Sequence, residues 1–349
     1  MKNQFPKKYS DIISLENLFI AWQEFVCGKR GKRDIQEFSL SLADSIVQLH
    51  ADLATYTYKH GGYLAFNISD PKPRNIHKAS VRDRVLHHAI YRQLYPFFDK
   101  TFISDLFSCR LDKGAHRALN RFRSFGLKVS KNHTRTAWVL KMDIKKFFAS
   151  IDHEVLLDIL SSYMPDRRIL GLLKAVIQSF STDIGQSYND RAIIVQKIKG
   201  LPLGNLTSQL FCNVYLNEFD QFAKHKLKVK YYIRYADDFS LLSDDKQRLL
   251  GQVNQISEYL ERRLRLSLHP DKVYIKSLAA GVDFLGWVHF PYYRVLRRTT
   301  RRRMLRRICE YPTNESLQSY LGLLGHGNTF QLKQQLLNWY GFAFVPFVK

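Results

Sequence analysis

The stretch Y-Y-I-R-Y-A-D-D-F-S-L-L, residues 231–242, places two adjacent carboxylates between two apolar runs. The runs are separated only by a tight turn, so they predict a β-hairpin with Ala236 and Asp237 at its tip and Asp238 at the start of the return strand. Uncompensated carboxylates between strands this apolar are costly to bury. A bound Mg²⁺ would offset that cost, because it takes oxygen ligands from a few carboxylates and keeps its other positions for water and phosphate.

Another acidic pair, in S-D-D-K-Q at 243–247, has a simpler interpretation as a solvated turn at the start of a helix. A further carboxylate comes from V-L-K-M-D-I-K-K-F-F-A-S-I-D, residues 139–152, where Asp143 ends a predicted strand. By itself Asp143 would be an ordinary strand-terminal residue. Beside the hairpin tip it predicts a site for two divalent ions, which can activate a hydroxyl and stabilise a leaving pyrophosphate.

Charge predicts a polyanionic partner. The 349 residues include 54 Lys and Arg against 31 Asp and Glu, a formal net charge of +23. Such an excess is typical of nucleic-acid binding, although some basic proteins are merely basic. The densest basic run, R-V-L-R-R-T-T-R-R-R-M-L-R-R-I at 294–308, predicts a helix whose buried side carries Leu296, Met304 and Leu305.

The chain has features of a cytoplasmic globular protein. No run reaches the roughly 18 apolar residues of a membrane span, and the first twenty residues lack the pattern of a secretion signal. The four cysteines lie far apart, which argues against zinc knuckles and for a reducing compartment. We therefore expect a cytoplasmic protein with no membrane partner.

Hydrophobic periodicity predicts an α+β order of elements. Helices are expected within 12–60, at 167–180, after the glycines of 200–204, at 244–264 and from about 294. Another is expected from residue 153, with Asp152 as its N-cap. Strands are expected at 137–144, in the hairpin, and as a pair formed by K-V-Y-I-K-S (272–277) and D-F-L-G-W-V-H-F (283–290).

The motifs, taken in order, resemble the palm of a reverse transcriptase. They are M-D-I-K-K-F-F-A-S-I-D-H, G-L-P-L-G-N-L-T-S-Q, Y-A-D-D, H-P-D-K-V-Y-I and F-L-G-W. Upstream, K-P-R-N-I-H-K-A-S-V-R-D-R-V-L-H-H-A-I and F-S-C-R-L-D-K-G-A-H-R-A-L resemble finger motifs of bacterial and group II intron enzymes. The resemblance runs from about residue 70 to 290. It implies a right-hand polymerase with fingers at 1–136, a palm at 137–290 with a fingers insertion at about 165–199, and a basic helical thumb at 291–349.

The resemblance also implies roles for individual residues. Asp143 and Asp237 would be the principal ligands of two Mg²⁺ ions, for which Mn²⁺ could substitute. Asp238 would be a third carboxylate, and the Ile144 backbone would lie beside them. Lys272 would act as general acid. The nucleotide would contact Arg74, Lys146, Phe147, Phe148, Leu203, Gly204 and Gln209, with Phe148 excluding a 2′-hydroxyl. Phe284, Leu285, Gly286 and Trp287 would be the primer grip, and nucleic acid would contact Arg110, Arg297, Arg298, Arg301 and Arg302.

Simpler roles remain open for several of these residues. Arg74 could be a surface residue and Lys272 a solvated lysine. Arg110 could belong to a structural ion pair. One of Phe147 and Phe148 is expected to be a core aromatic.

One departure from the common pattern is informative. Most reverse transcriptases have a glutamine before the glycine that Gly204 matches, and Ser-Pro after it, whereas this chain has Leu203 and then Ser208 and Gln209. That pattern, with L-Q-S-Y-L-G-L-L-G-H-G-N-T-F at 317–330, resembles the enzymes of diversity-generating retroelements. Leucine offers only shape where glutamine offers hydrogen bonds, so we expect reduced fidelity, with errors opposite template adenines. The alternative is that Leu203 simply packs.

The sequence thus predicts an RNA-directed DNA polymerase that copies a retroelement template RNA into error-prone cDNA for diversification of a target gene. Its partners would be template RNA, the RNA–DNA hybrid, dNTPs and an accessory variability determinant protein, a small basic helical oligomer. With the chain ending at Lys349, no RNase H or integrase domain is expected. Alternatives are an antiphage-defence, retron-like or group II intron-like enzyme and, more remotely, a non-catalytic RNA-binding protein, against which the three intact carboxylates argue.

Overall fold

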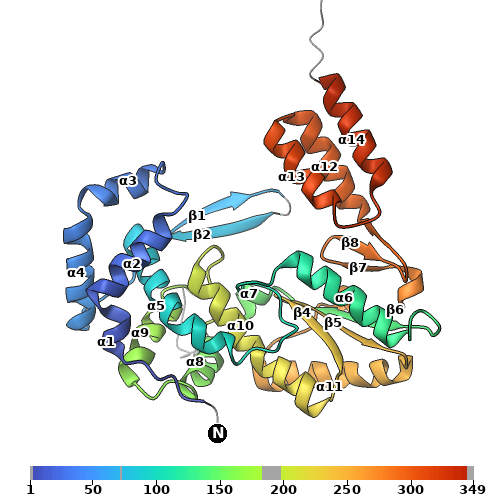
Figure 1. Ribbon diagram of the computed structural model, residues 1–349. Helices are drawn as coiled ribbons and strands as arrows, with labels where there is room; N and C mark the ends of the chain where they lie inside the picture. The colour runs from blue at the N-terminus through green and yellow to red at the C-terminus, as the bar shows by residue number, and fades with distance from the viewer. Residues whose placement is uncertain (1–2, 71–72, 183–197, 344–349) are drawn as a thin grey trace, which may run out of the picture. The chain divides into compact units, whose positions relative to one another are not determined.

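The structure, a computed structural model, describes residues 3–70, 73–182 and 198–343 (Figure 1). The chain divides into two compact units, each assembled from three segments. The first unit is made of Met1–Ser104, Ile144–Lys228 and Gln255–Pro270, and the second of Asp105–Asp143, Val229–Asn254 and Asp271–Lys349. Helices and antiparallel sheets are mixed along the chain, which confirms the predicted α+β class.

The first unit is mainly helical. Its N-terminal helices confirm the helices predicted between 12 and 60, and its later helices include the one predicted at 167–180. Its elements are α1 (Tyr9–Ile13), α2 (Leu15–Val26), α3 (Arg33–Leu40), α4 (Leu42–Ala54), β1 (Tyr63–Ile68), β2 (Arg74–Ala79), α5 (Val81–Asp99), α7 (Phe147–Ser150), α8 (His153–Ser161), α9 (Arg167–Gln178), α10 (Leu206–Gln221) and the π-helix η1 (Phe222–Lys226). Residues 183–197 of the expected fingers insertion lie outside the described residues.

Side-chain caps fix where two of these helices begin. The Asp152 carboxylate accepts hydrogen bonds from the backbone N–H groups of Glu154 and Val155, at 3.1 and 3.3 Å, which confirms it as the N-cap of α8. Ser80 caps α5 in the same way through the N–H of Asp83. Helix α5 then packs against both α2 and α10, so it forms the centre of the unit.

The second unit is built on a four-stranded antiparallel sheet with strand order β4-β5-β3-β6. Its strands are β3 (Trp138–Asp143), β4 (Tyr231–Tyr235), β5 (Asp238–Ser243) and β6 (Tyr274–Ser277), which confirms the predicted hairpin and the predicted strand at 137–144. Helix α6 (Ala115–Val129) packs against β4 and β5 (Figure 1). Helix α11 (Lys246–Leu264) follows β5 and continues into the first unit.

A three-stranded antiparallel sheet and three helices complete the second unit. The strands are β7 (Val282–Phe284), β8 (Trp287–His289) and β9 (Arg294–Leu296), and the helices are α12 (Arg298–Glu310), α13 (Asn314–Leu324) and α14 (Phe330–Ala343). Short 3₁₀ turns, η2 (Pro270–Lys272) and η3 (Leu278–Ala280), flank β6. One continuous hydrophobic cluster joins side chains of the four-stranded sheet, α6, the three-stranded sheet and these helices. It includes Val139, Ile233, Phe122, Phe284, Leu324 and Leu336.

Two predictions about the C-terminal part were wrong. K-V-Y-I-K-S does not pair with D-F-L-G-W-V-H-F, because β6 pairs with β3 and the second stretch folds back on itself as β7 and β8. Leu285 and Gly286, at φ of 49° and 83°, form the tight turn that makes this possible. The basic helix begins at Arg298 rather than 294, because Leu296 is held in β9 opposite Trp287.

Gly327 is required by a close approach of the chain to Trp287. A Cβ at this position would overlap the Trp287 indole ring and lie 2.9 Å from the Arg294 carbonyl oxygen. The loop that carries Gly327 joins α13 to α14, and the Arg294 guanidinium donates a hydrogen bond to the His326 carbonyl in the same loop. This hydrogen bond therefore holds the loop against the ring.

We predict that Gly327→Ala lowers the free energy of unfolding by about 1–3 kcal/mol, the usual effect of overpacking. The matched control is Gly322→Ala on α13, where an added Cβ meets nothing within 4 Å. That variant should be neutral or stabilised by up to about 1 kcal/mol, because alanine is the better helix former. Urea unfolding followed by circular dichroism measures both, and equal effects in the two variants would contradict the predicted overlap.

Candidate active site

The three predicted carboxylates gather at one end of the four-stranded sheet. Asp143 is the last residue of β3, and it lies directly opposite Asp238, the first residue of β5, in the antiparallel register. Side chains opposite one another in such a pair have their Cβ atoms about 4.5–5.5 Å apart. Asp237 is next to Asp238 in the turn between β4 and β5. The sheet register, rather than nearness in sequence, therefore brings the carboxylates together.

The turn that carries Asp237 is held by polar contacts from two sides. Ala236 has a left-handed backbone with φ of 54°, and its N–H donates to the Ser108 hydroxyl at 2.8 Å. Its carbonyl accepts a hydrogen bond from the Arg234 guanidinium at 3.0 Å. Arg234 is fully buried and pairs through its backbone with Asp105 and Phe107. These contacts fix the turn, so the Asp237 backbone has a defined position.

Arg234 was missed by the sequence analysis. A charged residue in the middle of an apolar strand, two positions before the turn, was the available signal. A buried guanidinium needs hydrogen-bonding partners, and a turn carbonyl is one such partner.

The electrostatics of the site reflect burial and mutual repulsion. Burial raises the pKa of Asp237, and the nearby Asp143 carboxylate raises it further. Burial also raises the pKa of Asp238, while the Lys141 ammonium opposes this shift. Two lysines balance part of the negative charge: Lys272 Nζ lies 3.1 Å from Asp143 Oδ1, and Lys141 Nζ lies 2.9 Å from Asp238 Oδ2.

The carboxylates fit a divalent cation by their chemistry. The second oxygen of Asp238, Oδ1, is buried and has no hydrogen-bond partner. Such an oxygen is costly to bury unless it gains a donor or a cation. Within the described part of the chain, no group of three His, Cys, Asp or Glu side chains is gathered in a ready-made metal cage. A cation that keeps several waters and uses only one or two carboxylates needs no such cage.

The predicted primer-grip residues form the β7–β8 hairpin. Phe284 and Trp287 are buried in the core, where the Phe284 ring stacks on Phe122 with ring centroids 4.8 Å apart. Leu285 and Gly286 form the turn between the strands. Contacts from this hairpin to a nucleic acid would therefore come from the turn and its backbone rather than from the two buried rings.

In the first unit, the structure brings together three of the predicted nucleotide-binding residues. The His77 N–H donates to the Leu203 carbonyl at 3.0 Å, and the Asn205 side chain donates to the His77 carbonyl at 2.9 Å. The loop at 203–205 thus lies along β2, whose first residue is Arg74. Gly204 has φ of 104°, and a Cβ there would lie 2.9 Å from the Ile76 side chain, so this approach requires glycine.

The remaining predicted nucleotide-binding residues lie on α7, just before it and on α10. Lys146 is exposed and has a left-handed backbone with φ of 45°. Phe147 is buried, which confirms that one of the two phenylalanines is a core residue, and Phe148 is half-buried. Gln209 is half-buried in the first turn of α10. Ile144 is buried and forms a β-bridge with Leu268.

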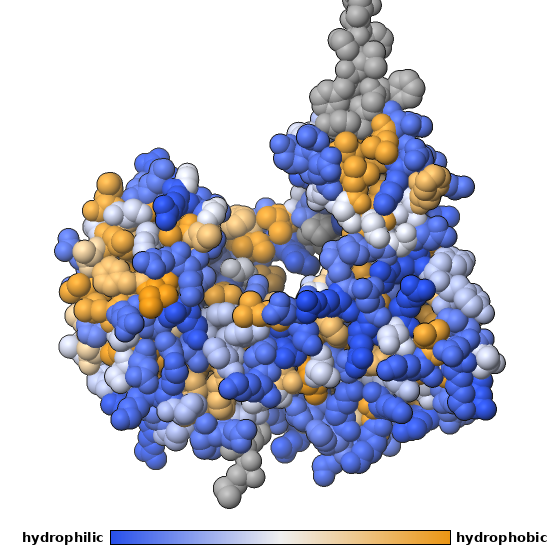
Figure 2. Space-filling view, in the orientation of Figure 1, coloured by the Kyte–Doolittle hydropathy of each residue, from blue (hydrophilic) through white to orange (hydrophobic). Residues whose placement is uncertain are grey.

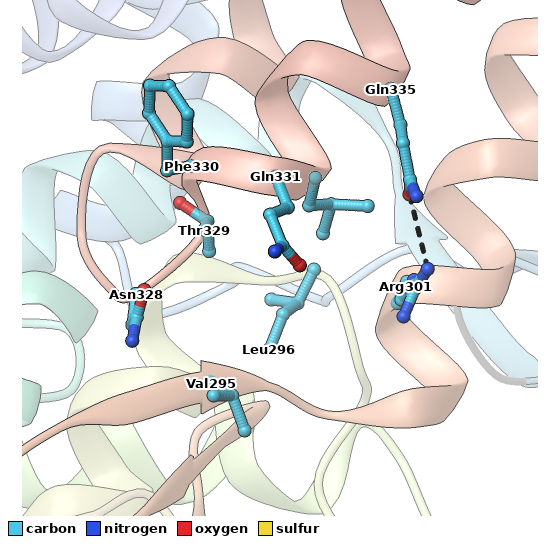
Figure 3. A pocket seen from close by; sticks show the side chains of 9 residues that line it. Val295, Leu296, Arg301, Asn328, Thr329, Phe330, Gln331 and Gln335 are labelled. Carbon is cyan, nitrogen blue, oxygen red and sulfur yellow. Dashed lines mark hydrogen bonds between the residues drawn. The ribbon is translucent and has the colours of Figure 1, made fainter.

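The predicted nucleic-acid-binding arginines differ in their surroundings. Arg298, Arg301 and Arg302 are exposed on α12, and Arg301 donates a hydrogen bond to Gln335 on α14 across a cavity of about 540 Å³ (Figure 3). The residues that line this cavity include none of the three aspartates. Arg297 is ion-paired with Asp283 at 3.0 Å, and the Arg110 guanidinium donates to the Leu106 carbonyl at 3.3 Å, so these two have structural contacts.

The surface of the second unit suits a polyanion. Figure 2 shows hydrophilic residues over most of the face formed by α6, where Arg117, Arg123 and Lys128 are exposed. Together with the exposed arginines of α12, they give this unit a cationic surface that can contact phosphates. Among the described helices, none combines the length and the apolarity needed to span a bilayer.

Comparison with known proteins identifies the family of the chain. The chain matches the reverse transcriptase (RNA-dependent DNA polymerase) family over residues 67–289, and it belongs to that family. Members of the family copy an RNA template from dNTPs, so the chain is an RNA-directed DNA polymerase, a nucleotidyltransferase.

Its relatives include proteins encoded by group II introns. It is 25% identical to Protein YkfC of Escherichia coli (strain K12) over 284 residues, which cover 71% of this chain and 70% of that protein. It is 22% identical to the group II intron-encoded protein LtrA of Lactococcus lactis subsp. cremoris over 286 residues, covering 76% of this chain and 45% of LtrA. The match to the putative COX1/OXI3 intron 2 protein of Saccharomyces cerevisiae, 20% over 283 residues, covers 65% of this chain and 30% of that protein.

We predict that Asp237→Asn stabilises the protein in EDTA at neutral pH. Because the folded-state pKa of Asp237 is raised, ionisation weakens the folded state as the pH rises above the ordinary aspartate range. The asparagine variant escapes this penalty, so its advantage in melting temperature should be absent near pH 3 and present at pH 7. Excess Mg²⁺ should stabilise the wild type more than the variant, because only the wild type keeps the carboxylate as a ligand.

Thermal unfolding at both pH values, with EDTA or Mg²⁺, measures these differences. The matched control is Asp244→Asn, which changes an exposed aspartate of the second acidic pair. A lower melting temperature for Asp237→Asn than for wild type in EDTA at pH 7 would contradict the prediction.

Proposed function

We propose that Asp143 and Asp237, with Asp238 beside them, are the catalytic carboxylates and that they bind two Mg²⁺ ions. The observation that carries this proposal is the register that sets Asp143 opposite Asp238, next to the turn with Asp237. The raised pKa of Asp237 and the unpartnered Asp238 Oδ1 support cation binding. Mn²⁺ should substitute, because it accepts the same oxygen ligands.

Divalent ions held there would activate the primer 3′-hydroxyl and balance the charge that develops on the pyrophosphate. The protein's own groups would complete the site. Lys272 lies 3.1 Å from Asp143 and is 46% exposed, so its ammonium can also reach a phosphate oxygen, where we propose that it acts as general acid. The half-buried Phe148 would exclude a 2′-hydroxyl, and Arg74, Lys146 and Gln209 would contact the nucleotide.

Primer extension on an oligonucleotide-primed RNA template tests the assignment of the carboxylates. Asp143→Asn and Asp237→Asn should each lower the rate of dNTP addition at least about 100-fold, because each removes charge stabilisation from the transition state. Asp244→Asn serves as the matched control, since Asp244 belongs to an acidic pair at a helix start and is exposed. A variant of both Asp143 and Asp237 that still makes full-length cDNA would contradict the assignment.

We further propose that the product is error-prone cDNA copied from a retroelement template RNA, for diversification of a target gene. The support is the pattern of Leu203, Gly204 and Gln209, and the half-burial of Leu203, whose backbone is fixed by His77. The accessory variability determinant protein, with which the enzyme would share its RNA, and a cytoplasmic location belong to this proposal. All four cysteines are free thiols, which suits a reducing compartment.

Leu203→Gln tests the fidelity part of this proposal. A carboxamide restores hydrogen bonding beside the new base pair, so misincorporation opposite template adenine should fall roughly tenfold. Sequencing of cDNA made in vitro measures the error spectrum. Leu250→Gln changes an exposed leucine of α11 and should leave the spectrum as in the wild type. An unchanged adenine error rate in Leu203→Gln would show that fidelity is set elsewhere.

The relatives support a second candidate, an enzyme of the group II intron type. LtrA is a group II intron-encoded protein, and it matches this chain over 286 residues at 22% identity. The DNA beside the gene separates the two candidates. A template and variable-repeat pair that differs at adenines favours the retroelement, whereas a surrounding intron favours the second candidate.

A further inference from the structure

Lys141 is a buried lysine whose ammonium contacts two strands beyond its own. It lies on β3 two residues before Asp143, so both side chains point to the same face of the strand. Its side chain is only 12% exposed. A lysine this buried is costly unless its charge is paired and its N–H groups are hydrogen-bonded. Its partners therefore explain what the residue does.

The Lys141 ammonium makes three contacts. It donates to Asp238 Oδ2 on β5 at 2.9 Å and to the Asp283 backbone carbonyl on β7 at 2.6 Å. It also lies over the Phe284 ring, 5.4 Å from the ring centroid. Asp238 belongs to the four-stranded sheet and Asp283 to the three-stranded sheet, so one ammonium group joins the two sheets.

These contacts restrict how Asp238 can act. Lys141 holds one carboxylate oxygen, while the other is buried without a partner. The carboxylate therefore cannot rotate without breaking its ion pair with Lys141. The free oxygen is the one with no competing donor, and its direction depends on Lys141.

The same ammonium also fixes the β7–β8 hairpin at its first strand. On the other side of the hairpin, Arg297 pairs with the Asp283 side chain at 3.0 Å, and the Arg297 N–H donates to the Gly286 carbonyl at 3.0 Å. Asp283 is thus held through its carbonyl by Lys141 and through its carboxylate by Arg297. The Lys141 contact connects the hairpin to Asp238, a carboxylate of the proposed catalytic site.

We propose that Lys141 is a positioning residue for nucleotide addition, which holds the Asp238 carboxylate in a fixed position relative to the β7–β8 hairpin. This proposal rests on the catalytic role proposed for the carboxylates. Its chemical basis is a single ammonium group shared between an acidic side chain of the site and the backbone of the hairpin. The ammonium needs acceptors for its N–H groups, and one of these acceptors belongs to the hairpin.

Lys141→Met tests the proposal, because it keeps the length of the side chain and removes the charge and the donors. We expect kcat for dNTP addition, measured per active site by burst titration, to fall at least about tenfold. The primer–template Kd should stay within about twofold, since many phosphate contacts determine it. Mn²⁺ binding to the nucleotide-free protein, followed by electron paramagnetic resonance, should become at least about threefold tighter, because a neighbouring cation is lost.

This pair of opposite changes separates positioning from a merely structural role. Damage to the fold would weaken both Mn²⁺ binding and turnover. Removal of the Lys141 charge instead tightens Mn²⁺ binding, while the loss of positioning slows turnover. Lys276→Met is the matched control, since Lys276 lies on β6 of the same sheet, is exposed, and places its ammonium over the Tyr274 ring at 5.2 Å. It should leave turnover and Mn²⁺ affinity as in the wild type.

If the methionine variant unfolds, Lys141→Gln provides the same measurements, because it keeps a donor for the Asp283 carbonyl. Lys141→Arg keeps the charge, so its turnover should be higher than that of Lys141→Met. Wild-type turnover in Lys141→Met or Lys141→Gln, or parallel losses of Mn²⁺ affinity and turnover, would overturn the proposal. Full activity of the Asp143 and Asp237 variants would instead overturn the proposed catalytic site on which it rests.

Discussion

The antiparallel pairing of β3 with β5 is the constraint on which the site depends. It sets Asp143 directly opposite Asp238, so two like charges meet at the end of a sheet whose faces are largely buried. The turn residue Asp237 adds a third carboxylate. Backbone hydrogen bonds and apolar packing along the strands hold these groups together against their repulsion. Burial raises the pKa of both Asp237 and Asp238, and the Asp143 carboxylate raises it further. Positive charge at this end of the sheet therefore stabilises the folded chain.

Two kinds of cation can supply this positive charge: lysine side chains, which are fixed in the fold, and metal ions, which can exchange. Lys141 and Lys272 each neutralise one carboxylate, and the buried Arg234 fixes the turn through the Ala236 carbonyl. The charge that they leave uncompensated, including the free oxygen of Asp238, is what the proposed Mg²⁺ ions would neutralise. Side chains therefore supply the permanent part of the countercharge, and the proposed ions would supply the rest.

Local sequence patterns predicted the secondary-structure elements of the site. They did not predict the contacts between residues that lie far apart in the sequence. The hairpin at 231–242, the strand ending at Asp143 and the cap at Asp152 depend on neighbouring residues, and all were predicted correctly. The pairing of β6 with β3 was not predicted. Several strands of similar composition could pair with the free edge of β3, and the sequence alone does not show which of them does. Lys141 was missed because a lysine within an apolar strand usually reaches solvent, and only the tertiary structure shows that this one turns toward Asp238 and Asp283.

The hydrophobic cluster of the second unit has a mechanical consequence. Leu324 and Leu336 from the C-terminal helices belong to the same continuous cluster as Val139 of β3 and Ile233 of β4, two strands of the sheet that holds the aspartates. Swinging those helices away as a free flap would open this shared interior to water. The C-terminal helices and the strands of the four-stranded sheet should therefore lose their structure in one cooperative step when the protein is heated.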